Sequence, residues 1–333
     1  MKAVVMTAAG GTEVLEVRSL PEPRIRRASQ IKVRLKAAGV NPLDTKLRKR
    51  GVFFENALPA ILGCDGAGVV TEVGSSVRRF KPGDAVWFCN GGLGGEPGNY
   101  AEYTVVEEAA AALKPRSLSF VEAAAAPLVL ITAWEALYDR ARLKPGQTVL
   151  VHGGAGGVGH VAIQLARLAG ARVCTTVGTM ENAKLARGLG AEEIILYSKR
   201  DFVVAVREWT QGEGVSVALD TIGGEVFRRT MGVVAHYGDL VTLLDPGSGV
   251  SWKEARNRNL RIGFELMLTP MLAGFPEARR HQVIILEQCA RWFDEGRLKI
   301  HVSRTFPLEQ AGAAHALLET GHMTGKAVLT MEP

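Results

Sequence analysis

The sequence predicts an α/β protein built from a doubly wound parallel sheet and a second, mostly β, barrel-like part. Strands and helices alternate regularly between residues 148 and 244, which is typical of a parallel sheet with right-handed crossovers. A glycine-rich turn joins the first of these strands to its helix. Short strands joined by glycine and proline turns fill most of residues 1–118, and a chain of 333 residues is long enough for two domains.

The glycine-rich turn carries the pattern of a dinucleotide-binding site. An apolar strand, Thr148–His152, runs directly into it, and a helix is predicted over residues 157–169. Three of its glycines fit G-x-G-x-x-G, in which the first makes the tight turn, the second lets a pyrophosphate approach the backbone, and the third allows close packing of helix on strand. The helix N-terminus adds free N–H groups and a positive dipole end for the phosphates. The pattern therefore predicts a Rossmann domain with cofactor contacts from Gly154, Ala155, Gly156, Gly157, Val158 and Gly159.

The end of the next strand, residues 171–177, indicates which dinucleotide binds. NAD-dependent enzymes usually place Asp or Glu there to hold the ribose 2′-hydroxyl, but this strand runs into Gly178 instead. Because no carboxylate repels a 2′-phosphate, NADPH is favoured over NADH. Lys199 and Arg200 border the expected phosphate, or else belong to the solvated surface. Further cofactor contacts are expected from Thr179, Lys184 and Tyr197.

Composition and charge narrow the class of protein further. The chain is 47% hydrophobic and 22% charged, and no apolar run reaches the roughly 18 residues that a membrane span needs. Its net charge of +6 comes from basic residues spread along the sequence, which suits an anionic cofactor, and no nucleic-acid motif accompanies them. The four cysteines form no C-x-x-C pair, which argues against disulfides and a structural zinc lobe. With no signal peptide in view, these features predict a cytoplasmic protein that acts on a small molecule rather than on a membrane or nucleic acid.

The remaining segments indicate how the domains divide. Ser119 and Glu122 form a capping box, which predicts a helical region that continues to about residue 142. After residue 262 the sequence predicts a helix over 276–296, a strand over 300–304, a helix over 308–319 and a strand over 326–331. These pieces do not extend the nucleotide-binding sheet, so they are expected to complete the first domain. The predicted domains are residues 1–120 with 263–333, and residues 121–262.

Four short motifs surround the glycine-rich turn in a fixed order. They are Gly39–Asp44 (GVNPLD), Leu62–Gly68 (LGCDGAG), Thr132–Leu137 (TAWEAL) and Gly325–Leu329 (GKAVL). Together they resemble the medium-chain dehydrogenase/reductase superfamily, and most closely its zinc-free quinone oxidoreductase (ζ-crystallin-like) branch, over essentially the full length. The resemblance implies a GroES-like catalytic domain beside the Rossmann domain, and it implies a homodimer.

The resemblance also allows metal binding to be judged. Zinc-dependent members bind catalytic zinc through a Cys in the first motif, a His in the second, and a Cys or acidic residue just before the Thr of the third. Asn41, Cys64 and an apolar position near Leu128 stand there in this chain. A catalytic zinc needs three protein ligands, so no metal is expected. Some relatives place a tyrosine over the active site, where this chain has Phe53 or Phe54.

These features lead to a hypothesis for the reaction. The chain is predicted to be an NADPH-dependent oxidoreductase that transfers hydride to quinones or other activated carbonyl or enone acceptors without zinc. Asn41 would donate through its amide to the oxyanion that forms on the acceptor, and Asp44 would orient neighbouring groups. By resemblance, Thr132 would lie near the nicotinamide, Leu244 would line its far side, and Lys326 would close the site over the cofactor.

Two other classes of function stay open at this point. The first is a zinc-free enoyl or alkenal reductase that reduces C=C bonds, or an alcohol dehydrogenase-like enzyme. The second is an NADPH-binding structural or RNA-binding protein of the ζ-crystallin type, which the basic net charge alone supports. Analysis of the reaction products would distinguish the first class from a quinone reductase. Salt-dependent retention of RNA would identify the second class.

Overall fold

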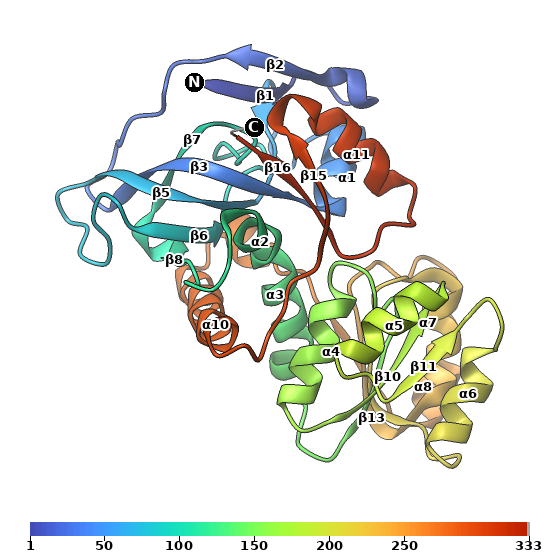
Figure 1. The fold of residues 1–333 in the computed structure, drawn as a ribbon. Coiled ribbons are helices and arrows are strands. Elements are labelled where there is room, and N and C mark those ends of the chain that lie inside the picture. The colour runs from blue at the N-terminus through green and yellow to red at the C-terminus, as the bar shows by residue number, and fades with distance from the viewer. Residues whose placement is uncertain (332–333) are drawn as a thin grey trace. The chain divides into compact units, whose positions relative to one another are not determined.

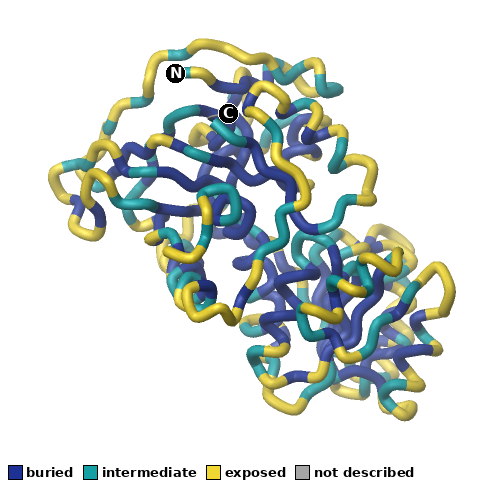
Figure 2. The backbone as a smooth tube through the Cα atoms, viewed as in Figure 1, coloured by how far each residue is buried: buried dark blue, intermediate teal, exposed yellow. Residues whose placement is uncertain are grey.

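The computed structural model describes residues 1–331 and divides the chain into two compact units (Figure 1). Unit 1 combines Met1–Leu128 with the chain from Thr269 onward, and unit 2 is Val129–Leu268. These boundaries, after Leu128 and Leu268, lie eight and six residues later than the predicted boundaries after residues 120 and 262. In each unit the central strands are buried and the connecting loops are exposed, as Figure 2 shows.

Unit 2 is built on a sheet of six parallel strands. Its order is β11-β10-β9-β12-β13-β14, so the order reverses direction between β9 and β12. Ligands of doubly wound sheets bind at the carboxyl ends of the strands at this reversal. The strands are β9 (Thr148–Val151), β10 (Arg172–Val177), β11 (Glu193–Leu196), β12 (Val215–Asp220), β13 (Val234–Thr242) and β14 (Arg261–Phe264).

The helices of unit 2 connect these strands, which confirms the predicted alternation. Apolar side chains from β9, β10, β12 and β13 pack with those of α6 and α7 in one buried core, which includes Leu150, Phe202 and Phe227. The helices are α4 (Gly159–Leu168), α5 (Met180–Gly188), α6 (Phe202–Trp209), α7 (Gly224–Thr230) and α8 (Lys253–Asn257), with a 3₁₀ turn at Met231–Val233. Before β9 lie α3 (Pro127–Trp134) and a π-helix, Glu135–Arg140.

Two details of unit 2 differ from the sequence-based expectation. The helix predicted over 225–234 ends early and β13 starts at Val234, with an irregular register before Asp239. Tyr237 inside this stretch has a φ of 62°, so β13 departs from regular extended backbone there. The strand β14, which pairs with β13, was not predicted and keeps residues 263–268 with unit 2 rather than with the catalytic domain.

Unit 1 contains a seven-stranded sheet and a smaller three-stranded sheet. The large sheet has the order β15-β16-β3-β5-β6-β8, with β7 also paired to β3, and the small sheet has the order β2-β1-β4. Every pairing is antiparallel except β15 with β16. The strands are β1 (Lys2–Met6), β2 (Leu15–Ser19), β3 (Gln30–Val40), β4 (Ala60–Ile61), β5 (Asp65–Val73), β6 (Ala85–Cys89), β7 (Tyr103–Glu107), β8 (Ala111–Leu113), β15 (Val302–Pro307) and β16 (Lys326–Thr330).

The helices of unit 1 lie against these sheets. The predicted capping box starts α2, because Ser119 Oγ accepts the Glu122 N–H at 3.2 Å and Glu122 Oε2 accepts the Ser119 N–H at 2.8 Å. Helix α2 packs on β3, β5 and β16, which is why residues 121–128 belong to unit 1. The helices are α1 (Pro42–Arg50), α2 (Phe120–Ala125), α9 (Thr269–Ala273), α10 (Pro276–Asp294) and α11 (Ala311–Glu319), with 3₁₀ turns at Thr12–Val14, Glu108–Ala110 and Leu308–Gln310. Within residues 1–331, no helix is long and apolar enough to cross a membrane.

Candidate active site

A buried polar cluster lies where three strands of unit 1 meet. Strand β3 ends at Val40 and is followed by Asn41, which caps α1; β5 begins with Asp65, and β16 begins with Lys326. The register of the antiparallel sheet sets Ala327 opposite Val40 and Asp65 opposite Gly39. Side chains far apart in the sequence are thereby brought together at the end of β3.

The side chain of Asn41 is bonded on both sides within this cluster. Its Nδ2 donates to Asp65 Oδ2 at 2.9 Å, and its Oδ1 accepts a hydrogen bond from Lys326 Nζ. Lys326 Nζ also donates to the Val40 carbonyl at 3.2 Å and lies 3.8 Å from Asp65 Oδ2. All three side chains are buried. Burial lowers the pKa of Lys326 and raises the pKa of Asp65, and the attraction between the two groups opposes both shifts.

Asp44 supports Asn41 from the first turn of α1. Asp44 Oδ2 accepts the Asn41 backbone N–H at 2.8 Å and the Tyr100 hydroxyl at 3.0 Å. The same hydroxyl lies 3.2 Å from His315 Nε2. Burial raises the pKa of Asp44 to about 7, against the opposing effect of these two hydrogen bonds. Asp44 thus holds the backbone of Asn41, and its predicted role as an orienting residue stays a prediction.

The glycine-rich loop of unit 2 follows β9, at the reversal of the strand order. A Cβ on Gly154 would collide with Thr175 Oγ1, and a Cβ on Gly159 would collide with the Gly153 carbonyl. Packing therefore requires a glycine at both positions, as the motif predicts. A Cβ on Gly156 would meet only the Gly153 carbonyl, at 3.2 Å, so the second motif glycine lies in a more open part of the loop. Residues 155–158 complete the turn and α4 begins at Gly159, so the loop fits a bound pyrophosphate.

The ends of β10 and β11 bring a second group of predicted cofactor residues together. Thr179 caps α5, and its hydroxyl accepts the Asn182 N–H at 3.1 Å. Tyr197 is 62% exposed, and its hydroxyl would lie 2.5 Å from a Cβ on Gly178. The tyrosine therefore lies over Gly178 at the end of β10.

The basic residues near this strand end differ in their partners. Lys184 and Lys199 are exposed. Arg200 forms ion pairs with Glu193 at 3.2 Å and with Glu208. Arg200 is therefore already engaged within unit 2, whereas the two lysines extend into solvent.

The structure adds residues that the sequence had not singled out. Asp220 ends β12 at the strand reversal; its Oδ1 accepts the Gly223 N–H at 2.9 Å and its Oδ2 accepts the Thr242 hydroxyl at 2.8 Å. Leu244, just after β13, lies beside Gly223, whose N–H Asp220 accepts. Its expected contact with the nicotinamide stays a prediction. In unit 1, Asp65 and Tyr100 also belong to the cluster. Asp65 lies in one of the four sequence motifs, whereas none of these motifs includes Tyr100.

Two further residues lie inside their units. Thr132 is buried in α3. His152, after β9, is also buried, and its ring nitrogens lie 3.1 Å from Thr176 Oγ1 and 2.9 Å from Thr230 Oγ1. Burial lowers the pKa of His152 to about 4, so this imidazole is neutral at physiological pH.

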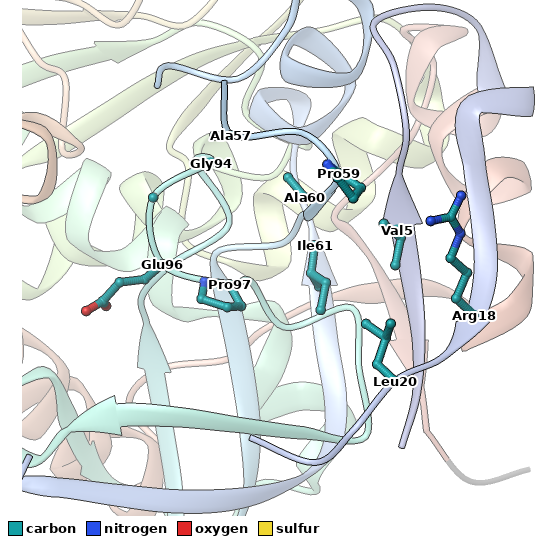
Figure 3. Close-up of a pocket in the computed structure, with 11 residues that line it drawn as sticks. Val5, Arg18, Leu20, Ala57, Pro59, Ala60, Ile61, Gly94, Glu96 and Pro97 are labelled. Carbon is teal, nitrogen blue, oxygen red and sulfur yellow. The ribbon is translucent and has the colours of Figure 1, made fainter. Parts of the chain in front are cut away.

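Unit 1 also has a surface cavity of about 320 Å³, which is shown in Figure 3. Its walls are mostly apolar, with Val5, Leu20 and Ile61 among them. The charged groups at its rim are paired: Arg18 with Glu16 at 2.7 Å, and Glu96 with Arg27 at 3.0 Å. No residue of the Asn41 cluster lines it. The cluster, rather than this cavity, therefore offers polar groups for chemistry.

Comparison with known families agrees with this arrangement. Residues 27–116 match the alcohol dehydrogenase GroES-like domain, and residues 189–329 match the family described as zinc-binding dehydrogenase. The predicted GroES-like and Rossmann folds are confirmed. The fold and the two groups of site residues define an NAD(P)H-dependent oxidoreductase.

Similar proteins indicate the superfamily and the branch to which the chain belongs. A quinone oxidoreductase of Pseudomonas aeruginosa is 33% identical over 98% of this chain and 99% of its own length. An NAD-dependent alcohol dehydrogenase structure has a TM-score of 0.90 and 36% identity, over 99% of this chain and 100% of its own. The structure of the Escherichia coli quinone oxidoreductase in complex with NADPH has a TM-score of 0.88 and 29% identity, over 99% of this chain and 100% of its own. The chain belongs to the medium-chain dehydrogenase/reductase superfamily, in its quinone oxidoreductase branch.

Because the family matched by residues 189–329 is described as zinc-binding, the side chains at the expected ligand positions decide whether zinc fits. The positions in question hold the amide of Asn41, the thiol of Cys64 and the apolar side chain of Leu128. Nowhere in residues 1–331 do three His, Cys, Asp or Glu side chains gather as a metal site. The thiol pKa of Cys64 is raised by its hydrogen bond with Cys89 and by burial, which opposes the thiolate that zinc needs. These residues do not fit a catalytic zinc.

Proposed function

We propose that this protein uses NADPH to reduce quinones, or other activated carbonyl or enone acceptors, without a catalytic zinc. The observation that carries the proposal is that one chain holds both a glycine loop that fits a pyrophosphate, in unit 2, and a buried polar cluster around the Asn41 amide, in unit 1. The absence of a carboxylate after β10, at Gly178, supports NADPH over NADH, as does the NADPH complex of the Escherichia coli relative.

The residues of unit 2 would hold the cofactor. The loop from Gly154 to Gly159 and the start of α4 would bind the pyrophosphate, and Tyr197 and Lys199 would meet the adenosine 2′-phosphate. When bound, NADPH supplies the hydride. The protein's own task is to orient the acceptor and to stabilise the negative charge that hydride addition leaves on its oxygen.

In unit 1 the Asn41 amide is the proposed donor to that oxygen. A hydroquinone anion is a stable product that takes its proton from water, so a quinone needs little acid catalysis. An unactivated ketone would need a metal or a strong acid beside its oxygen. The donor set around Asn41 therefore suits activated acceptors.

The test measures oxidation of NADPH and NADH, side by side, by one purified sample with a panel of quinones, enones and alcohols, together with its metal content. Quinone-dependent oxidation that is at least tenfold more efficient with NADPH, in zinc-free protein, supports the proposal. Stoichiometric zinc with alcohol oxidation refutes it. Saturated products from enones, with no turnover of quinones, would assign the protein to C=C reduction instead.

A homodimer is part of the same proposal. Strand β14 ends the sheet of unit 2, so one of its edges has no partner strand within the described residues. Phe264 and Leu266 beside this edge are 57% and 53% exposed. An unprotected edge with apolar neighbours suits pairing with a second copy. Light scattering of the purified protein tests it, and a monomer at micromolar concentration would contradict it.

A further inference from the structure

The Asn41 amide is held between two groups of opposite charge. The Lys326 ammonium donates to the amide oxygen, and the Asp65 carboxylate accepts one of the two N–H groups of Nδ2 at 2.9 Å. A primary amide has a second N–H donor. If the amide flipped, its N–H groups would face the Lys326 ammonium and its oxygen would face the Asp65 carboxylate. The two charges therefore fix the orientation of the amide and the direction of its second N–H.

The Lys326 ammonium also changes the strength of the amide as a donor. A cation at the oxygen draws electron density from the amide and makes its N–H groups more acidic, and chains of hydrogen bonds in a buried setting strengthen one another. The backbone of Asn41 is fixed at the same time, because its N–H is bonded to Asp44 at 2.8 Å.

The cost of burying Lys326 indicates that its charge has a use. The side chain is only 2% exposed, and burial disfavours its charged form. A methionine of similar length would fill the space without that cost. Lys326 also bonds the Asn41 oxygen and the Val40 carbonyl, while Asp65 Oδ2 stays 3.8 Å away, so the ammonium is directed at the amide rather than at its counterion.

We propose that Lys326 and Asp65 are positioning residues that orient and polarise the Asn41 amide, whose second N–H stabilises the oxyanion formed on the acceptor. This inference rests on the proposed reductase function. Hydride, with its electron pair, adds to the acceptor; the displaced π electrons move to the acceptor oxygen, which then takes a proton from water, and the dinucleotide leaves oxidised. The inference replaces the expectation that Lys326 closes the site over the cofactor.

The kinetic test compares the wild type with Lys326→Met over a graded series of para-quinones. A weaker hydrogen-bond donor to the oxyanion lowers kcat more strongly when the product anion is more basic. We expect the fall in kcat to grow from about threefold with the most electron-poor quinone to about 100-fold with the least. The Kd for NADPH, measured by fluorescence without acceptor, should change less than twofold.

A matched control removes another buried lysine of unit 1. Lys32 is paired with Glu22 at 2.8 Å and Glu72 at 2.9 Å, outside the cluster. Lys32→Met should lower kcat equally, if at all, for every quinone. A Lys326→Met variant that binds NADPH more than tenfold more weakly, with an equal kcat loss for every quinone, would overturn the inference in favour of a cofactor contact.

A second measurement does not depend on turnover. The side-chain amide protons of Asn41, assigned by their loss in Asn41→Ser, should give two widely separated NMR signals. In Lys326→Met and Asp65→Asn the two signals should move closer to each other, toward the chemical shifts of a free primary amide. Unchanged signals in both variants refute the positioning role. If the signals behave as expected but no acceptor is reduced by the wild type, the proposed function fails while the held amide stands.

Discussion

The buried carboxyl of Glu265 in unit 2 allows a prediction with a defined sign and size. Glu265 follows β14, and burial, together with a hydrogen bond to Glu135, raises its pKa to about 9. Arg140 Nε lies 3.0 Å from Glu265 Oε2 and opposes this shift, but its side chain is half-exposed and its effect is screened. The folded protein therefore keeps a proton that the unfolded chain releases near pH 4.5.

The stability consequence follows from proton linkage. Between about pH 4.5 and 9 the folded state binds one proton more than the unfolded state, so the free energy of unfolding falls by about 1.4 kcal/mol per pH unit from this group. Glu265→Gln imitates the protonated carboxyl and cannot ionise. Relative to the wild type, it should gain about 2.7 kcal/mol between pH 5.5 and 7.5.

Urea unfolding at pH 5.5, 6.5, 7.5 and 8.5 checks the expected divergence of the two curves. Glu213→Gln, at an exposed position after α6, is the control and should follow the wild type at every pH. Parallel pH profiles for wild type and Glu265→Gln would show that Glu265 is ionised in the folded protein, which would refute the reasoning.

Three further predictions concern the two groups of site residues. Gly154→Ala should destabilise the protein by about 1–3 kcal/mol and weaken NADPH binding, because its Cβ would collide with a threonine hydroxyl; Gly188→Ala, with open space around it, should lack both effects in urea unfolding and fluorescence titration. Lys199→Ala should raise the KM for NADPH about tenfold without changing that for NADH, as expected for one lost phosphate contact; Arg200→Ala should not, because Arg200 is held in ion pairs. Asn41→Ala should lower kcat about 100-fold in steady-state assays while the Kd for NADPH stays within twofold, and an equal loss of both would contradict its role as a donor.

The sequence predicted unit 2 well because its signals are local. The glycine motif and the alternation of strands with helices each depend on residues close together in the chain. Strand β14 was missed because four residues with a glycine among them, Arg261–Phe264, carry no readable period. The early start of β13 was not predicted, because its first residues pair irregularly with β12 and its Tyr237 has left-handed backbone, neither of which can be read from the sequence.

The polar cluster of unit 1 was only partly predictable. Asn41 and Asp44 stood in one recognisable motif, so their proximity followed from the sequence. The contact of Lys326 with Asn41 depends on the register of β16 against β3, and that register joins segments 285 residues apart. Tyr100 and His315 join through tertiary packing alone, since neither lies near a motif.

The discontinuous build of unit 1 has a consequence for biosynthesis. As the chain leaves the ribosome, all of Val129–Leu268 emerges before β15 and β16, so unit 2 can fold while the larger sheet of unit 1 still lacks the strand that pairs with the end of β3. During that interval the end of β3 has an open edge, and Asp65 lacks its counterion Lys326. Nascent chains would therefore acquire nucleotide affinity before they acquire a complete Asn41 cluster, and chains that stall before residue 326 would bind dinucleotide without reducing an acceptor.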